Sequence, residues 1–147
     1  MNAEQKLLEL GLSLPAPPSP GGNYVSSKVV GSLLYLAGAT SAARGTAGAE
    51  RTIEEGYAAA QECMLTQLAV VKQALGSLDK VREIVSLSGY VNAVAEFPDS
   101  PAVINGASDL LVAVFGDAGR HVRAAIGVSA LPRNALVELQ LVVGIHG

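Results

Sequence analysis

The stretch from His121 to Leu139 constrains the fold of this chain more than any other. On both sides of the segment between Leu131 and Asn134, apolar residues alternate with small or polar ones, and a proline and an asparagine in that segment favour a turn. The pattern predicts two strands that pair as a hairpin and turn their apolar residues to one face. In this register Arg123 and Glu138 share the opposite face. Glu138 then lies across from Gly127, about 13 Å along the strand from Arg123, which leaves room for a small acid between a cation and a carboxylate.

Composition narrows the class of protein. The length of 147 residues fits one domain, and half of the residues are hydrophobic while 4% are aromatic, so we expect an aliphatic core. Ten basic residues against thirteen acidic ones give a net charge of −3 without a basic stripe, which disfavours nucleic acid as a partner. Cys63 is the single cysteine and the two histidines lie far apart, so we expect no internal disulfide, no metal site and no cofactor.

Signals for membranes and secretion are weak. No apolar run reaches the roughly 18 residues of a membrane span. Glu4, Lys6 and Glu9 interrupt the start of the chain, where a signal peptide would be apolar. We therefore expect a cytoplasmic protein with no membrane partner.

The order of the predicted elements indicates the fold class. Residues 1–20 are expected to form a short helix and a proline-rich arm, and residues 21–147 a single domain. This domain begins with two strands joined at Gly31-Ser32 and a loop over 39–51. A helix from Thr52 to Gly76, a strand over 81–92 and a helix capped by Ser100 follow. With the C-terminal strands the order is β-β-α-β-α-β-β. It predicts an α+β fold with two helices on one face of a mostly antiparallel sheet.

The sheet face away from the helices needs a cover. We expect Ile84, Tyr90, Leu136 and Val142 on this face, which makes it too apolar to be solvated. Another subunit is the expected cover.

The C-terminal pattern also resembles that of a known family. The run from Arg123 to Leu131-Pro132, followed by Val137-Glu138-Leu139, is similar to the signature of the Rid proteins. These are the reactive intermediate deaminases, also called the YjgF-like or endoribonuclease L-PSP family. Gly22-Asn23-Tyr24 and Asn105 fall where the family has comparable residues, and the element order is similar after residue 20. The resemblance implies a chorismate-mutase-like fold of the bacillus type, a homotrimer, and ligand sites in the three clefts between subunits.

The resemblance implies a reaction as well: the hydrolysis of enamine-derived 2-imino acids to 2-keto acids and ammonia, without a cofactor. By this resemblance Arg123 binds the carboxylate of a small metabolite, and Glu138 positions or activates water. Tyr24 and Asn105 contribute to the substrate pocket, and the main chain of Ala125 lies beside the imine.

Two positions depart from the family pattern. Ser108 stands where the family has an aromatic residue three positions after the asparagine, and His121 stands where it has the proline of a Pro-x-Arg lead. Together with the loop over 116–121, they indicate a separate branch of the family.

The residues alone leave structural roles open for each candidate. Arg123 and Glu138 also suit intersubunit salt bridges, Tyr24 suits packing, His121 suits a solvated strand entry, and Cys63 suits a small buried position. Three functions therefore compete. The first is imine deamination, and the second is a non-catalytic trimer that binds small carboxylic metabolites or a protein partner. The third, an endoribonuclease, is disfavoured by the acidic balance.

Overall fold

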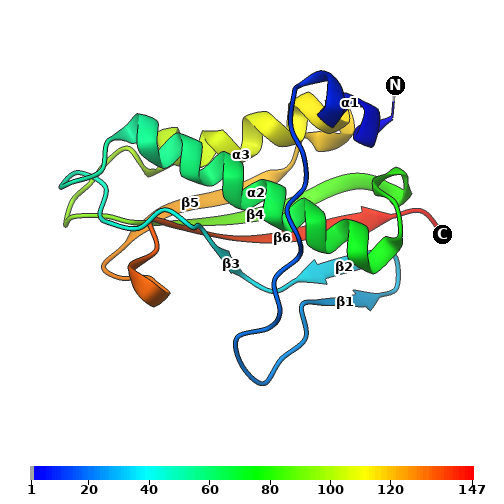
Figure 1. Cartoon of the computed structure of the whole chain (residues 1–147), viewed down its shortest axis with the longest axis horizontal. Helices are drawn as coiled ribbons and strands as arrows, with labels where there is room; N and C mark the ends of the chain where they lie inside the picture. The colour runs from blue at the N-terminus through cyan, green and yellow to red at the C-terminus, as the bar shows by residue number, and fades with distance from the viewer. Residues whose placement is uncertain (1) are drawn as a thin grey trace.

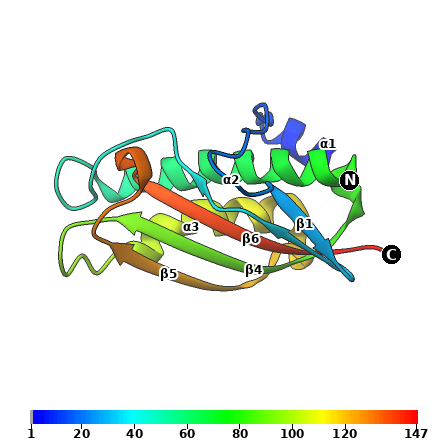
Figure 2. The same ribbon diagram turned by 90° about the horizontal axis from the view of Figure 1, so that it is seen from below.

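The computed structural model describes residues 2–147 as helices packed on one face of a six-stranded sheet (Figure 1). The order is β1-β2-β6-β4-β5, and β3 pairs with the part of the β6 edge that β2 leaves free. Seen from below in Figure 2, the sheet lies in front of the helices, and no other element of residues 2–147 covers this face. The α+β, chorismate-mutase-like fold class is confirmed. The strands are β1 (Ser27–Val30), β2 (Leu33–Leu36), β3 (Ala39–Thr40), β4 (Val81–Asn92), β5 (Val122–Val128) and β6 (Val137–Ile145).

The first long helix begins and ends where the sequence predicts. Thr52 caps it: the Thr52 hydroxyl accepts the N–H of Glu55 at 3.1 Å, and the Glu55 carboxylate accepts the N–H of Thr52 at 3.0 Å. Gly76 ends it with a left-handed backbone at φ +87°. The α-helices are α1 (Ala3–Glu9), α2 (Ile53–Leu75) and α3 (Ser100–Phe115), and the 3-10 turns are η1 (Leu78–Lys80), η2 (Gly116–Gly119) and η3 (Pro132–Asn134).

The start of α3 differs by one residue from the prediction. Asp99 is the cap, and Ser100 is the first helical residue, with its hydroxyl buried and unbonded within residues 2–147. Further along, Gly106 lets α3 approach α2, because a side chain there would overlap with the carbonyl of Tyr57.

A second finding on α3 concerns membranes. By length and composition the stretch Ser100–Gly119 could cross a membrane, although Asp109 and Asp117 interrupt it, and the core helix of a compact domain can have the same length and composition. Here Val103, Ile104 and Leu111 of this stretch are fully buried within the domain.

The predicted pairing of the two C-terminal strands is wrong. β5 runs parallel to β4, with Arg123 opposite Leu87, and β6 runs antiparallel along the other edge of β4. The segment between β5 and β6 crosses the end of β4. There the Asn92 side chain donates hydrogen bonds to Asn134 Oδ1 (3.1 Å) and to the Ala135 carbonyl (3.2 Å). Alternation looks the same whether two strands are neighbours or have a third between them, so the sequence pattern cannot separate the two arrangements.

The interposed strand also reverses the predicted orientation of Arg123. Arg123 is in register with Leu87, which is fully buried beneath the helices. Glu138 is in register with Tyr90, and Tyr90 with Ile126, on the helix-free face. Residues in register point to the same side of a sheet. Arg123 therefore faces α3 and Glu138 faces away, so the two do not share a face as predicted.

The helix-free face carries two of the four residues expected there. Tyr90 and Val142 lie on it, half-buried. Ile84 and Leu136 are instead buried in the core, Ile84 next to a bulge that shifts the β4–β6 register and Leu136 just before β6 begins. Other apolar residues of this face are exposed at the two edges of the sheet: Val122, Ile126, Val30 and Tyr35.

The N-terminal residues pack back onto the helices. α1 contributes Ala3 and Leu7 to the core, and Glu4 forms an ion pair with Lys72 of α2 at 3.4 Å. The proline-rich segment then crosses α2 in an extended conformation (Figure 1). It ends at Gly21, whose N–H is donated to the Tyr24 hydroxyl at 3.0 Å.

Candidate functional site

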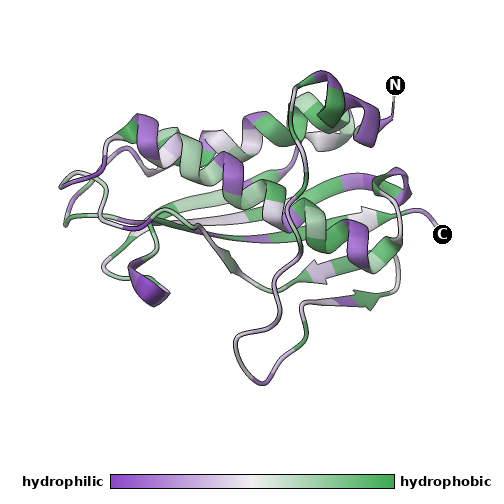
Figure 3. Ribbon diagram, in the orientation of Figure 1, coloured by the Kyte–Doolittle hydropathy of each residue, from purple (hydrophilic) through white to green (hydrophobic). Residues whose placement is uncertain are grey.

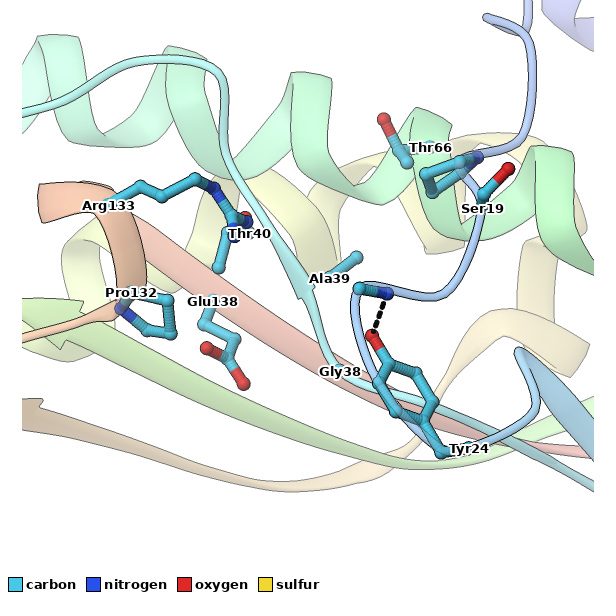
Figure 4. Close-up of a pocket in the computed structure, with 11 residues that line it drawn as sticks. Ser19, Tyr24, Gly38, Ala39, Thr40, Thr66, Pro132, Arg133 and Glu138 are labelled. Atoms are coloured by element: carbon cyan, nitrogen blue, oxygen red, sulfur yellow. Dashed lines mark hydrogen bonds between the residues drawn. The ribbon is translucent and has the colours of Figure 1, made fainter.

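A cavity of about 510 Å³ opens where the proline-rich arm, β3 and the η3 turn meet (Figure 4). Glu138 of β6, Tyr24 and Arg133 line it, together with Thr40 of β3 and Thr66 of α2. The structure thus brings Tyr24 and Glu138 into one pocket. Tyr24 is half exposed, so it lines the cavity more than it packs the core.

Glu138 lies where two short strands, β3 and β2, share the same edge of β6. β3 pairs with β6 at Thr40 and Glu138, and β2 pairs with it further along, so the chain crosses at Gly38 directly beside the carboxylate. A Cβ atom at Gly38 would lie 2.6 Å from Glu138 Oε2, so a side chain there would displace the carboxylate from its present position. Within residues 2–147 the Glu138 carboxylate has no ion pair and no hydrogen bond. The carboxylate thus lies at the wall of the cavity without a partner among these residues.

Arg133 brings a positive charge to the same cavity. Its backbone is left-handed at φ +56°, followed by Asn134 at φ +58°, a conformation that costs most residues about 1–2 kcal/mol. The Arg133 side chain lies over β3, where Nη2 donates to Thr40 Oγ1 at 2.7 Å (Figure 4). Figure 3 shows this turn as one of the most hydrophilic parts of the fold. The sequence pattern predicts the turn but not the position of Arg133 at this cavity. A basic residue directly after Leu131-Pro132 was the available signal.

Arg123 lies outside this cavity, between β5 and α3. Its Nη1 donates to Ser108 Oγ at 3.0 Å and its Nη2 to the Pro101 carbonyl at 3.3 Å. Pro101, Asn105 and Ser108 share one helix face because they are four and three residues apart. Asn105 is exposed between the two groups that hold Arg123, and Ala125 lies on the same side of β5 as Arg123. The structure thus gathers Arg123, Asn105 and Ala125.

His121 is not the solvated residue expected from the sequence. It is half-buried, with Nε2 at 2.9 Å from Ser108 Oγ and Nδ1 at 2.7 Å from the Gly119 carbonyl. It therefore belongs to the same group of contacts as Arg123.

The candidate residues form two separate walls within one chain. Glu138 and Tyr24 belong to the cavity at β3 and β6, which we call the acid–base wall. Arg123, Asn105 and Ala125 belong to the α3–β5 edge, which we call the arginine wall. The side chains of Glu138 and Arg123 point to opposite faces of the sheet.

Comparisons with known proteins agree with this architecture. The family model described as "YjgF/chorismate mutase-like, putative endoribonuclease" matches residues 4–145. The chain belongs to this family. The Trypanosoma cruzi relative "Protein TCP17" is 40% identical, and the match covers 95% of this chain and 92% of that protein.

Solved structures of YjgF-like proteins share the fold along the whole chain. A "putative endoribonuclease" from Shewanella oneidensis superposes with a TM-score of 0.95 at 34% identity, covering 99% of this chain and 100% of the other. RidA from the Antarctic bacterium Psychrobacter sp. superposes with a TM-score of 0.59 at 25% identity, covering 88% and 94%. The identification with the YjgF/Rid family is thereby confirmed.

In this YjgF-like chain the two departures from the family pattern touch. Ser108 and His121 are thirteen residues apart in sequence and share a hydrogen bond, and Ser108 also accepts from Arg123. Each departure therefore changes the surroundings of the same guanidinium.

Cys63 lies behind the acid–base wall and is buried, as expected. Its thiol donates to the Ala39 carbonyl at 3.1 Å. Burial is the main cause that raises the pKa of Cys63 to about 12, so the thiol stays protonated and is not a nucleophile at neutral pH. Among residues 2–147, no three His, Cys, Asp or Glu side chains gather as they would to hold a metal ion.

Proposed function

We propose that this YjgF-like protein hydrolyses 2-imino acids to 2-keto acids and ammonia in a cleft between subunits. The observation that carries the proposal is the unpaired Glu138 carboxylate on the wall of a cavity of about 510 Å³, with the hydroxyls of Thr40 and Tyr24 on the same wall. A general base needs a free carboxylate within reach of a water molecule, and this cavity provides the space for both water and a small acid.

The proposed reaction is a simple hydrolysis. Glu138 takes a proton from water as the water oxygen forms a bond to the imine carbon, and the C=N electrons move to nitrogen, which takes that proton from Glu138 to give the carbinolamine. Glu138 then accepts the hydroxyl proton of the carbinolamine as the C=O bond forms and passes it to the nitrogen, which leaves as ammonia. No electrons are exchanged with a cofactor, so the chain needs only to bind the acid and hold the water.

The carboxylate anchor in this proposal comes from the neighbouring chain. Arg123 does not line the cavity of its own chain, and its side chain and that of Glu138 point to opposite sheet faces. The apolar residues at the edges of the helix-free face, among them Val122 and Ile126, suit burial against a second chain. The family resemblance implies a homotrimer, and we propose that its three clefts pair the arginine wall of one chain with the acid–base wall of the next.

The first experiment tests the reaction. A 2-imino acid is generated in situ by an amino acid oxidase, and ammonia or keto acid release is followed with and without the protein. We expect release faster than the spontaneous rate. A rate equal to the spontaneous one, for both a small and a bulky imino acid, contradicts deamination.

The second experiment tests the shared cleft. Chains with Arg123→Ala are unfolded and refolded together with chains carrying Glu138→Gln. If each site uses residues from two chains, random mixing rebuilds about a quarter of the clefts with both native residues, so activity returns although each variant alone lacks it. No recovery, with mixed trimers shown by native mass spectrometry, contradicts the two-chain site.

Binding without turnover is the second candidate function. Arg123 and Arg133 would both hold a carboxylate even if no water were activated. Binding of pyruvate that is independent of Glu138, with no ammonia release, would favour this candidate.

Endoribonuclease activity, named in the descriptions of some relatives, is the third candidate, and the net charge of −3 disfavours it. Cleavage of a labelled RNA that depends on Glu138 or Arg123 would favour it.

A further inference from the structure

Ser108, His121 and Arg123 form one chain of hydrogen bonds between α3 and β5. Arg123 Nη1 lies 3.0 Å from Ser108 Oγ, and Ser108 Oγ lies 2.9 Å from His121 Nε2. His121 Nδ1 lies 2.7 Å from the Gly119 carbonyl in η2. All three side chains are half-buried, so the group is partly shielded from competing water.

The chemistry of the partners determines the direction of two of these bonds. An arginine can only donate, so Ser108 Oγ accepts from Arg123 and still has a proton and a second lone pair for the bond with His121 Nε2. A carbonyl can only accept, so His121 Nδ1 carries the proton that reaches Gly119. Every polar atom in this chain of bonds therefore has a partner.

The far end of this chain of bonds is anchored in the backbone. A side chain at Gly119 would overlap with the Leu111 carbonyl of α3, so η2 is packed directly against that helix. The Gly119 carbonyl, and with it His121, is thus set by backbone contact with the same helix that carries Ser108. The support does not depend on a flexible surface group.

The support leaves the binding capacity of Arg123 open. The bonds to Ser108 and Pro101 use two of the five N–H groups that a guanidinium offers, so three remain for a ligand. Within residues 2–147 Arg123 has no ion pair. A guanidinium that is oriented before the ligand arrives loses less side-chain freedom on binding than an unsupported one.

We propose that Ser108 and His121 are positioning residues that hold the Arg123 guanidinium ready for a substrate carboxylate. The proposal rests on the proposed function, because it takes Arg123 as the carboxylate anchor. The serine and histidine touch no substrate and act through the arginine alone.

The test measures the affinity of the full-length protein for pyruvate by calorimetry. Ser108→Ala and His121→Phe should each weaken binding about fivefold to tenfold, the effect expected when one long side chain loses its preorganisation. Ser108→Thr, which keeps the hydroxyl, should restore most of the affinity. In turnover assays KM should rise by the same factor, while kcat should change less than twofold.

A double-variant comparison separates positioning from general damage. In the Arg123→Ala background, Ser108→Ala and His121→Phe should have no further effect on the remaining binding, because their target is gone. Tyr57→Phe is the matched control. It removes a hydroxyl of α2 that donates to Asp109 of α3, the helix that carries Ser108, at 2.7 Å. This hydroxyl makes no hydrogen bond to Arg123, so the substitution should leave the affinity for pyruvate unchanged.

The outcomes distinguish this proposal from the proposed function. If Arg123→Ala weakens pyruvate binding and the Ser108 and His121 variants do not, the positioning proposal is wrong and the anchor stands. If Arg123→Ala has no effect, the anchor itself is wrong. If Ser108→Ala still weakens binding by the same factor in the Arg123→Ala background, the serine acts by another route and the proposal fails.

Discussion

Arg123 and Arg133 are held by the fold in opposite ways. Arg123 stands in a regular strand, half-buried, with two hydrogen bonds to α3. Arg133 is exposed on a turn with a left-handed backbone, and among residues 2–147 its side chain donates a hydrogen bond to Thr40 alone. At the arginine wall a side chain and a backbone carbonyl of α3 hold the guanidinium. At the acid–base wall a left-handed backbone directs the arginine toward Thr40. The first arrangement favours binding strength, and the second keeps a charge near Glu138 with little restraint.

The largest expected effect concerns Glu138. Glu138→Gln should lower kcat by a factor of roughly 10²–10⁴, as for loss of a general base, and leave pyruvate affinity within about twofold. Turnover and calorimetry on the same preparation check this. If Glu138→Gln instead weakens pyruvate binding and leaves kcat unchanged, Glu138 binds the substrate and does not activate water.

The second prediction contrasts the two arginines directly. Arg123→Ala should weaken pyruvate binding roughly 100-fold, because a charge-assisted contact is lost, and Arg123→Lys should recover little since lysine lacks the planar fork. Arg133→Ala should weaken binding by about threefold, because this side chain is exposed and screened. Circular dichroism and sedimentation should show both variants folded and assembled. Equal losses of pyruvate affinity from Arg123→Ala and Arg133→Ala would show that the two arginines contribute equally to binding.

The third prediction concerns the backbone of the η3 turn. Asn134→Ala should lower the free energy of unfolding by about 2 kcal/mol, because alanine is strained at φ +58° and the bond from Asn92 is lost. Asn134→Gly should cost about 1 kcal/mol, since glycine relieves the strain. Urea midpoints at one fixed protein concentration measure both. Equal effects of the two substitutions would show that backbone strain does not contribute.

The smallest effect is the alkaline response of Cys63. Its pKa rises from 9.0 to about 12 on folding, so the unfolded chain releases this proton at lower pH than the folded one. The associated stability is therefore complete below pH 9 and is lost as the pH rises toward 12. Relative to Cys63→Ala, the native protein should lose about 1 kcal/mol by pH 10 and nothing at pH 7. A thiol reagent that labels the folded protein at pH 7 would contradict this burial.

The sequence was sufficient for features that depend on neighbours along the chain. The capping box at Thr52, the stop at Gly76 and the strand Val81–Asn92 follow from local chemistry and alternation. The family signature identified Arg123 and Glu138 as the residues to examine. It also marked Ser108 and His121 as departures, without any sign that they meet.

The pairing of the last two strands was beyond the sequence pattern. Alternation states which residues of a strand share a face, but not which strand lies beside it. The β4–α3–β5 crossover places β4 between β5 and β6 and turns Arg123 toward the helix. The same strand order places Ser108 next to Arg123 and separates Arg123 from Glu138.

What the sequence by itself determined is local: element boundaries, an aliphatic core, an α+β order and a signature with an arginine and a glutamate. What only the tertiary structure decided is which of these residues meet. Strand order and helix packing depend on contacts between residues far apart in the chain, and a one-strand change in order moves a side chain from one wall of the sheet to the other. The cavity at Glu138 and the support of Arg123 are both products of that order.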